Sequence, residues 1–452
     1  MLSQLATELA ALSQSRAGFA GIAAPVRLGR IVSCDGLLVE ATGLDAPIGT
    51  ICRAVGKTGA DTPAAEVIGF RSGHSLMMML GDTVQLQPGT LVRPEGHPGM
   101  VAVGEAFLGR AIDGAGHAID GGGAIRSGTF RPLGGKREAA LERGSVAEPF
   151  DTGIRAVNAC LTMGLGQRIG IVAGSGVGKS KLIDMLMQGS DADILVIGLI
   201  GERGREVSDF VARHLHDPER RQRTAIVAVP ADHAANLRLR GAQHAVALAE
   251  YFRAQGKRVM LVIDSLTRVA HAAREIAFAL GDCAALRGYP ASAMGVITKL
   301  IERAGISSSS GGAITGIYTV LADGDDHNNP VVDTARAILD GHIVLSREIA
   351  QRGQFPAIDI PASLSRVMDD IAAPDHRAFA RQLRALIAAH DANRDLLIMG
   401  AYSPGSDAQL DRAIAMQGAI RAFLAQDLHE TVNMAESCDA LAVLMADATA
   451  AA

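Results

Sequence analysis

The stretch Ile169-Gly-Ile-Val-Ala-Gly-Ser-Gly-Val-Gly-Lys-Ser180 decides the fold of this 452-residue chain. It begins as a continuous apolar run, typical of a strand buried on both faces, and then becomes rich in glycine before Lys179. A helical pattern follows from Lys181. A strand that leads into such a loop and then into a helix matches the P-loop pattern, except that Ala173 occupies its first glycine position. The stretch therefore predicts an α/β domain built around a phosphate-binding loop.

The predicted loop binds phosphate through its backbone and its last two side chains. The glycines let successive N–H groups turn toward a β-phosphate, and the following helix adds the positive end of its dipole. Lys179 would reach the β- and γ-oxygens, and the Ser180 hydroxyl would hold Mg²⁺. ATP and Mg²⁺ are thus the expected cofactors. The expected nucleotide-binding residues here are Ala173, Gly174, Ser175, Gly176, Val177, Gly178, Lys179, Ser180 and Lys181.

Three further apolar runs, at residues 194–200, 224–229 and 259–263, are also continuous rather than alternating. Helical patterns separate them, which predicts a mostly parallel sheet covered on both faces. We place this P-loop α/β domain at residues 99–371.

The regions on either side of this domain have different sequence patterns. Residues 25–98 contain short apolar runs separated by Gly, Asp and Pro, which predicts a small β-barrel. Residues 372–452 are rich in Ala, Leu and Arg and predict a helical domain. In residues 1–24 a leucine stripe predicts a short amphipathic helix and a linker. Such a helix would pack on its own protein body, on a partner protein or on a membrane surface. Its stripe is Leu2, Leu5, Leu9 and Leu12.

Composition excludes several classes of protein. The formal net charge is −5 and aromatic residues make up only 3% of the chain, so we expect no nucleic-acid partner. No uncharged run is long enough to span a bilayer, so we expect peripheral membrane association at most. The N-terminus lacks the pattern of a secretory signal. Five scattered cysteines suggest neither a disulfide framework nor a zinc site. A cytoplasmic protein is expected.

Two carboxylates are candidates for the chemistry. Asp264 ends the apolar run 259–263, where a P-loop enzyme needs an acid that orders magnesium, although Asp is also a common helix cap. Glu202 follows the run 194–200, where it could polarise the attacking water. The same charged segment could equally be an ordinary solvated loop.

The chain resembles the rotary-type ATPases, a group that includes the ATP synthase β subunit and the ATPases of type III export. The similarity extends from about residue 25 into the C-terminal domain. The motifs that carry it are Leu108–Asp120, Gly201-Glu-Arg-Gly-Arg-Glu-Val207, Asp264-Ser-Leu-Thr-Arg268, Tyr289-Pro290 and Phe355–Arg366.

Within this group the chain is most similar to the flagellar type III protein export ATPases. Residues 336–347 and 400–414 support this, as does Ala173 in the P-loop. No acidic segment of the kind found in synthase β subunits is present. The implied fold is a RecA-like P-loop ATPase core between the β-barrel and the helical domain. The implied function is ATP hydrolysis that energises the export of flagellar proteins. The alternatives are the ATPase of a virulence type III secretion system and, from another class, a hexameric RNA helicase.

The resemblance implies a role for each motif residue. Lys179, Glu202, Arg203 and Arg366 would be catalytic, with Arg366 acting as an arginine finger on the nucleotide of the adjacent subunit. Ser180 and Asp264 would hold the metal. Phe355 would stack on adenine, unless it belongs to the core, and Tyr402 would form the other wall of the base pocket. One chain then holds both halves of an interface site, which implies a homohexamer.

The resemblance also implies partners and a location. A stator-like regulatory protein would bind the N-terminal helix. The export gate, chaperones and exported flagellar proteins would be the other partners. The protein would act at the cytoplasmic face of the inner-membrane export apparatus.

Overall fold

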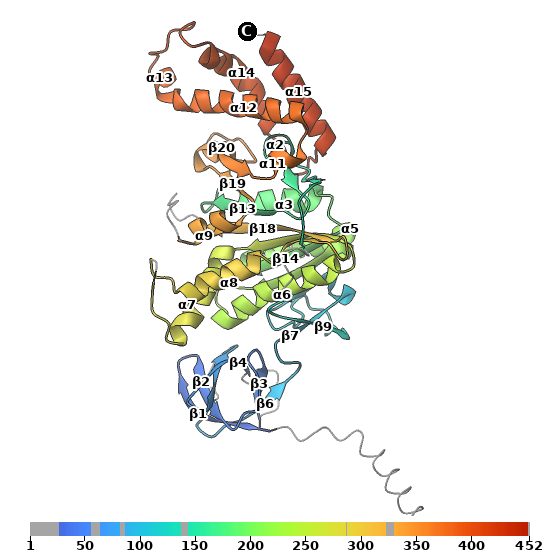
Figure 1. Cartoon of the computed structure of the whole chain (residues 1–452), viewed down its shortest axis with the longest axis vertical. Helices are drawn as coiled ribbons and strands as arrows, with labels where there is room; N and C mark the ends of the chain where they lie inside the picture. Colours follow the sequence, from blue (N-terminus) through green and yellow to red (C-terminus); the bar gives the residue numbers. More distant parts are fainter. Residues whose placement is uncertain are drawn as a thin grey trace, which may run out of the picture. The chain divides into compact units, whose positions relative to one another are not determined.

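The computed structural model describes residues 27–55, 64–81, 86–136, 143–285, 287–321 and 330–450, with side chains up to residue 446. The chain divides into two compact units, residues 1–99 and 100–452 (Figure 1). The predicted N-terminal helix of residues 1–16 lies outside the described residues. None of the helices in the described ranges combines the length and hydropathy that a transmembrane span needs.

The first unit contains a closed β-barrel with the strand order β1-β2-β5-β4-β3-β6, which confirms the predicted barrel. Ser72 and Gly73 join β4 to β5 with φ angles of 49° and 80°, as in a two-residue hairpin turn. Inward-facing side chains such as Val39, Val67 and Met77 are fully buried. The strands are β1 (Gly29–Asp35), β2 (Leu38–Thr42), β3 (Ile51–Ala54), β4 (Ala64–Arg71), β5 (His74–Met79) and β6 (Leu91–Glu95).

The second unit is built on a ten-stranded sheet with the order β20-β19-β13-β18-β16-β14-β15-β8, to which β17 and β10 add at one end of β18. The strands from β19 to β8 are mutually parallel, whereas β20 is antiparallel. This confirms the predicted α/β core. The strands are β8 (Arg110–Ile112), β10 (Arg143–Gly144), β13 (Arg168–Ala173), β14 (Ile194–Ile200), β15 (Thr224–Val229), β16 (Arg258–Asp264), β17 (Gly305–Ser307), β18 (Ala313–Leu321), β19 (Gly341–Leu345) and β20 (Ile358–Ser365).

Helices cover this sheet, which is why its central strands are apolar along their whole length. All seven residues of β14 are buried, and α6 packs along β14, β15 and β16. The helices of this core are α2 (Arg155–Cys160), α3 (Lys179–Gly189), α4 (Gly204–His216), α5 (Pro218–Arg223), α6 (Ala235–Arg253), α7 (Leu266–Ala279), α8 (Ala291–Ile301), α9 (Pro330–Ile338), α10 (Arg347–Gln351) and α11 (Met368–Ile371).

Short elements join the unit's first residues to the core. They are β7 (Met100–Val103) paired with β9 (Thr129–Pro132), the 3₁₀ turn η1 (Glu105–Phe107), and β11 (Pro149–Phe150) paired with β12 (Met163–Gly164).

The chain ends in the helices α12 (Pro374–Ala392), α13 (Arg394–Ile398), α14 (Ala408–Leu424) and α15 (Met434–Ala450), which confirms the predicted helical region. α12, α14 and α15 pack on one another, and α15 also packs on α2 of the core (Figure 1). Leu383 and Leu441 are fully buried in this packing. The helical region is therefore fastened to the core close to where the P-loop strand begins.

Candidate active site

The phosphate loop leaves β13 at Ala173 and enters α3 at Lys179. Gly176 and Gly178 adopt φ angles of +79° and +103°, a region that is costly for any residue with a Cβ atom. A Cβ on Gly176 would meet no atom within 4 Å, so the backbone conformation, and not crowding, requires glycine there. Val177 is only 2% exposed and anchors the loop in the core. The loop therefore presents its backbone to solvent from a fixed base.

Lys179 lies between two carboxylates. Its Nζ is 2.9 Å from Oε1 of Glu202 and 2.5 Å from Oδ1 of Asp264. The sheet register brings these groups together, because β14 and β16 are parallel neighbours with Leu199 opposite Asp264. From β18, the Thr319 hydroxyl donates a hydrogen bond of 2.6 Å to Oδ1 of Asp264. Residues from four segments of the chain thus converge at the carboxyl ends of the parallel strands.

The electrostatics of this cluster favour a basic Glu202. Burial and the nearby Asp264 charge raise the pKa of Glu202 above its ordinary value, even though Lys179 acts in the opposite direction. Burial alone would lower the pKa of Lys179, but the two carboxylates outweigh it and raise that pKa. Lys179 therefore stays a cation, and Glu202 is a stronger base than a solvated glutamate. Such a carboxylate suits general-base catalysis near neutral pH.

The other candidate residues near the phosphate loop lie outside this cluster. Ser180 and Lys181 lie exposed in the first turn of α3. The Arg203 side chain is 84% exposed and forms an ion pair of 3.4 Å with Glu206 on α4. The structure thus brings Lys179, Glu202 and Asp264 together but leaves Arg203 outside their cluster.

Phe355 lies beside the phosphate loop. A Cβ atom added to Gly178 would stand 3.8 Å from two carbons of the Phe355 ring. The side chain is 49% exposed, so Phe355 is not a core residue. Its carbonyl accepts a hydrogen bond of 2.9 Å from the Gln426 backbone N–H, just beyond α14. This exposed aromatic face beside the loop fits the expected contact with a base.

Arg366 lies at the other end of the strands, away from the phosphate loop. Because β20 is antiparallel to β19, its last residue, Ser365, pairs with Gly341, the first residue of β19. The eight residues of β20 span about 25 Å, so Arg366 and Phe355 flank the two ends of this strand. The exposed Arg366 guanidinium donates to the carbonyl of Arg336 at 3.0 Å. Arg366 therefore does not reach the phosphate loop of its own chain.

Tyr402 does not join Phe355. Its hydroxyl donates to Oδ1 of Asp411 at 2.8 Å and lies 3.1 Å from the Asp407 carbonyl oxygen, both at the N-terminal end of α14. Phe355 contacts the chain beyond the other end of α14. This helix has 17 residues and so is about 25 Å long. The expected role of Tyr402 as the second wall of a base pocket is therefore not supported by its position.

Two residues of the site were missed by the sequence analysis. Thr319 interrupts the apolar run of β18, and a hydroxyl inside a buried strand is a signal that could have found it. Gln426 carries no such signal, because its contact with Phe355 depends on how the C-terminal helices pack.

Comparison with known proteins settles the family. Residues 153–365 match the nucleotide-binding domain of the ATP synthase alpha/beta family, and residues 372–443 match the T3SS EscN ATPase C-terminal domain. The flagellum-specific ATP synthase of Pseudomonas aeruginosa is 45% identical over 94% of both chains. The chain belongs to the ATP synthase alpha/beta family, in its type III secretion branch.

Two other relatives of this ATPase come from type III secretion systems. The type 3 secretion system ATPase of Xanthomonas euvesicatoria is 42% identical, over 88% of this chain and 90% of its own length. The assembled ATPase EscN from the type III secretion system of enteropathogenic E. coli superposes with a TM-score of 0.85 at 37% identity, covering 92% of this chain and 99% of EscN. The ATPase activity and fold expected from the sequence are confirmed.

Proposed function

We propose that this ATPase hydrolyses ATP at the interface between identical subunits. The observation that carries the proposal is the Lys179–Glu202–Asp264 cluster beside the phosphate loop, with Arg366 held at the other end of the strands. Glu202 accepts the proton of the attacking water, and Lys179 balances the phosphate charge. Arg366 acts on the nucleotide of the adjacent subunit, because it cannot reach its own.

The residues present fit Mg²⁺ as the metal that accompanies ATP. Ser180 and Asp264 offer hard oxygen donors, which Mg²⁺ prefers. The described part of the chain contains no group of three or more His, Cys, Asp or Glu that could hold a metal ion by itself. This agrees with an ion bound by one or two protein oxygens together with phosphates. Bound there, Mg²⁺ would neutralise charge on the phosphate oxygens.

The assembly we propose is a homohexamer. Each chain carries a phosphate loop at one end of its strands and Arg366 at the other end. In a closed ring, every phosphate loop can therefore meet the Arg366 of a neighbouring chain. A relative with a TM-score of 0.84 and 37% identity is described as the assembled ATPase EscN in complex with its central stalk EscO. We infer that this ATPase likewise assembles and binds a partner protein.

The cellular role we propose is to energise the export of flagellar proteins through the flagellar type III apparatus, at the cytoplasmic face of the inner membrane. Relatives named flagellum-specific ATP synthase, from Pseudomonas aeruginosa and Salmonella typhimurium, are 45% and 43% identical. The 42% identity of the Xanthomonas type 3 secretion ATPase favours a second candidate, a virulence secretion ATPase.

A genetic experiment separates the two roles. Deleting the gene should abolish secretion of flagellar filament protein, and the wild-type gene should restore it whereas Glu202→Gln should not. Normal filament secretion in the deletion strain, with loss of other secreted proteins, would instead support the virulence role.

A further inference from the structure

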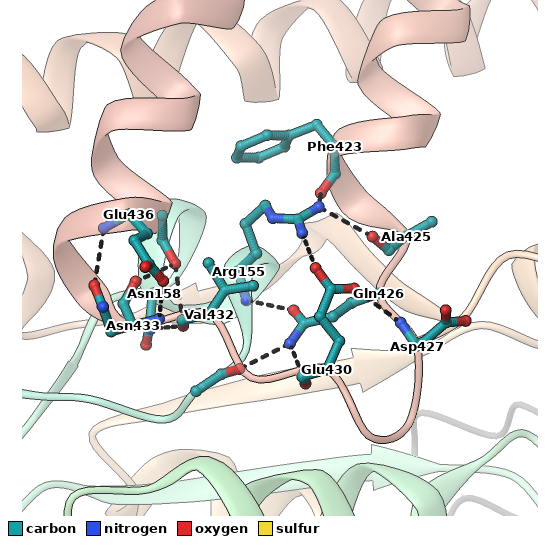
Figure 2. Close-up of polar contacts among 12 residues, drawn as sticks. Arg155, Asn158, Phe423, Ala425, Gln426, Asp427, Glu430, Val432, Asn433 and Glu436 are labelled. Atoms are coloured by element: carbon teal, nitrogen blue, oxygen red, sulfur yellow. Dashed lines mark hydrogen bonds and ion pairs between the residues drawn. The ribbon is translucent and has the colours of Figure 1, made fainter.

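The loop between α14 and α15 (residues 425–433) is clamped onto the segment 151–158, which precedes the P-loop strand (Figure 2). The Arg155 guanidinium donates to the carbonyls of Phe423 and Ala425 at 3.1 and 3.2 Å and pairs with Oε1 of Glu430 at 2.5 Å. One cation thus caps the C-terminal end of α14, where the helix dipole is negative.

A second set of contacts fixes the start of α15. The Asn158 side-chain amide donates to the Val432 carbonyl at 3.2 Å and to Oδ1 of Asp151 at 2.8 Å. The other oxygen of this Asp151 carboxylate accepts a hydrogen bond of 2.7 Å from the backbone N–H of Met434. The same short segment therefore holds the end of one C-terminal helix and the beginning of the next.

Gln426 is the centre of this clamp. Its Oε1 accepts a hydrogen bond of 2.7 Å from the Arg155 backbone N–H, and its Nε2 donates to the carbonyls of Gly153 and Glu430 at 2.8 and 2.9 Å (Figure 2). The residue is only 6% exposed, and its two contacts with the 151–158 segment are to the backbone of Gly153 and Arg155. The side chain thereby fixes the position of the Gln426 backbone.

That backbone leads directly to the nucleotide side of the sheet. The Gln426 N–H donates to the Phe355 carbonyl at 2.9 Å, and the Phe355 ring faces Gly178 of the phosphate loop. We propose that Gln426 is a positioning residue that sets the place of Phe355 at the base site and couples it to the C-terminal helices. This inference rests on the proposed ATP-hydrolysing function and on the contact between Phe355 and adenine that the family resemblance implies.

The coupling acts on the base and not on the phosphates. The phosphate loop is anchored in the core through Val177. Lys179 begins α3, whereas the contact of α3 with the 425–433 loop is made by Gln188 at the other end of that helix. Gln426→Ala leaves the Arg155 N–H and the carbonyls of Gly153 and Glu430 without this partner, so the 425–433 loop loosens and Phe355 loses its fixed position. Binding of a ligand that has phosphates but no base should be unaffected.

The test compares dissociation constants for ATP, ADP and inorganic tripolyphosphate in the full-length ATPase. For Gln426→Ala we expect ATP and ADP to bind about fivefold to thirtyfold more weakly, with tripolyphosphate binding unchanged. Gln188→Ala is the matched control, because Gln188 on α3 donates to the His429 carbonyl of the same loop but does not reach Phe355. It should leave all three constants near wild type.

Arg155→Lys provides a second variant should Gln426→Ala fail to fold. It keeps the charge opposite Glu430 but loses the forked contacts with two carbonyls, and it should weaken ATP binding less, again without changing tripolyphosphate binding. Equal weakening of ATP and tripolyphosphate by either variant would reduce Gln426 to a general structural role and overturn the inference.

Phe355→Ala tests the base contact of Phe355 separately from the positioning role of Gln426. If it weakens ATP binding selectively while Gln426→Ala does not, the positioning role fails and the base contact stands. If Phe355→Ala itself leaves ATP binding unchanged, the proposed base contact fails and the role of Gln426 fails with it.

Discussion

Phe355 and Arg366 flank opposite ends of one strand, β20, so an ATPase subunit that presents the aromatic ring at its own phosphate loop presents the arginine about 25 Å away. A single chain cannot place both on one nucleotide. We propose that a second copy supplies the arginine, with its Arg366 facing the phosphate loop of the first. On this proposal, hydrolysis depends on assembly.

The first prediction concerns Glu202. Glu202→Gln removes the proton acceptor while it keeps the shape of the side chain and leaves the phosphate loop and Lys179 intact. Hydrolysis should fall by about 10²–10⁴, the usual contribution of a general base, while ATP binding persists. Steady-state turnover and equilibrium binding measured on the same preparation check this. Turnover near the wild-type rate would mean that another group accepts the proton.

The second prediction concerns pH. Glu202 must be ionised to accept a proton, and burial together with Asp264 raises its pKa. Activity should therefore decline as pH falls through that raised pKa, beginning above the range of an ordinary glutamate at about 4.3. The pH profile of kcat checks this, with circular dichroism at each pH as the control for folding. A profile that stays flat down to the ordinary glutamate range would contradict the assignment.

The third prediction concerns Gly201, which joins β14 to Glu202. Its φ is +74°, and a Cβ atom there would lie 2.6 Å from the Cβ of Arg268. Gly201→Ala should displace Glu202 and lower kcat about tenfold to a hundredfold, with a smaller effect on ATP binding.

Gly204 provides the matched control for this experiment. A Cβ atom on Gly204 meets no atom within 4 Å, and the residue lies at the start of α4. Gly204→Ala should leave kcat close to wild type. Equal loss of activity in both variants would show that the crowding at Gly201 is not the cause.

Local sequence patterns were enough to predict the elements that carry the chemistry. The continuous apolar runs 194–200 and 224–229 coincide with β14 and β15, because strands buried on both faces need apolar side chains throughout. The glycine-rich run marked the phosphate loop for a similar reason, since its backbone angles exclude most other residues. Resemblance to a family then directed attention to Phe355 and Arg366.

Sequence patterns carry less information where long-range packing decides position. Tyr402 lies close in sequence to α14, but the helix places it about 25 Å from the end that contacts Phe355. Gln426 was not identified, because its partners Gly153 and Arg155 are more than 270 residues away in the chain. Neither separation is encoded in local periodicity.

The fourth prediction concerns the leucine stripe of residues 1–16, which lies outside the described residues. Four leucines would contribute about 1.5–2 kcal/mol each on burial, whereas ordering the segment costs roughly 1–2 kcal/mol per residue. We therefore expect the predicted helix to need a partner surface. Deleting residues 2–16 should leave the thermal midpoint almost unchanged and abolish co-purification of a stator-like regulatory protein. A large drop in the midpoint would show that the stripe belongs to the core.

The most direct test of the shared active site mixes two inactive variants. Arg366→Ala lacks the arginine finger, which is worth about 10³–10⁵ in rate in other nucleotide hydrolases, and Lys179→Ala lacks the phosphate lysine. In randomly mixed rings about a quarter of the interfaces would combine an intact Lys179 with an intact Arg366. Mixing should therefore restore ATP hydrolysis well above either variant alone. No recovery, with mixed rings demonstrated by native mass spectrometry, would contradict a site shared between subunits.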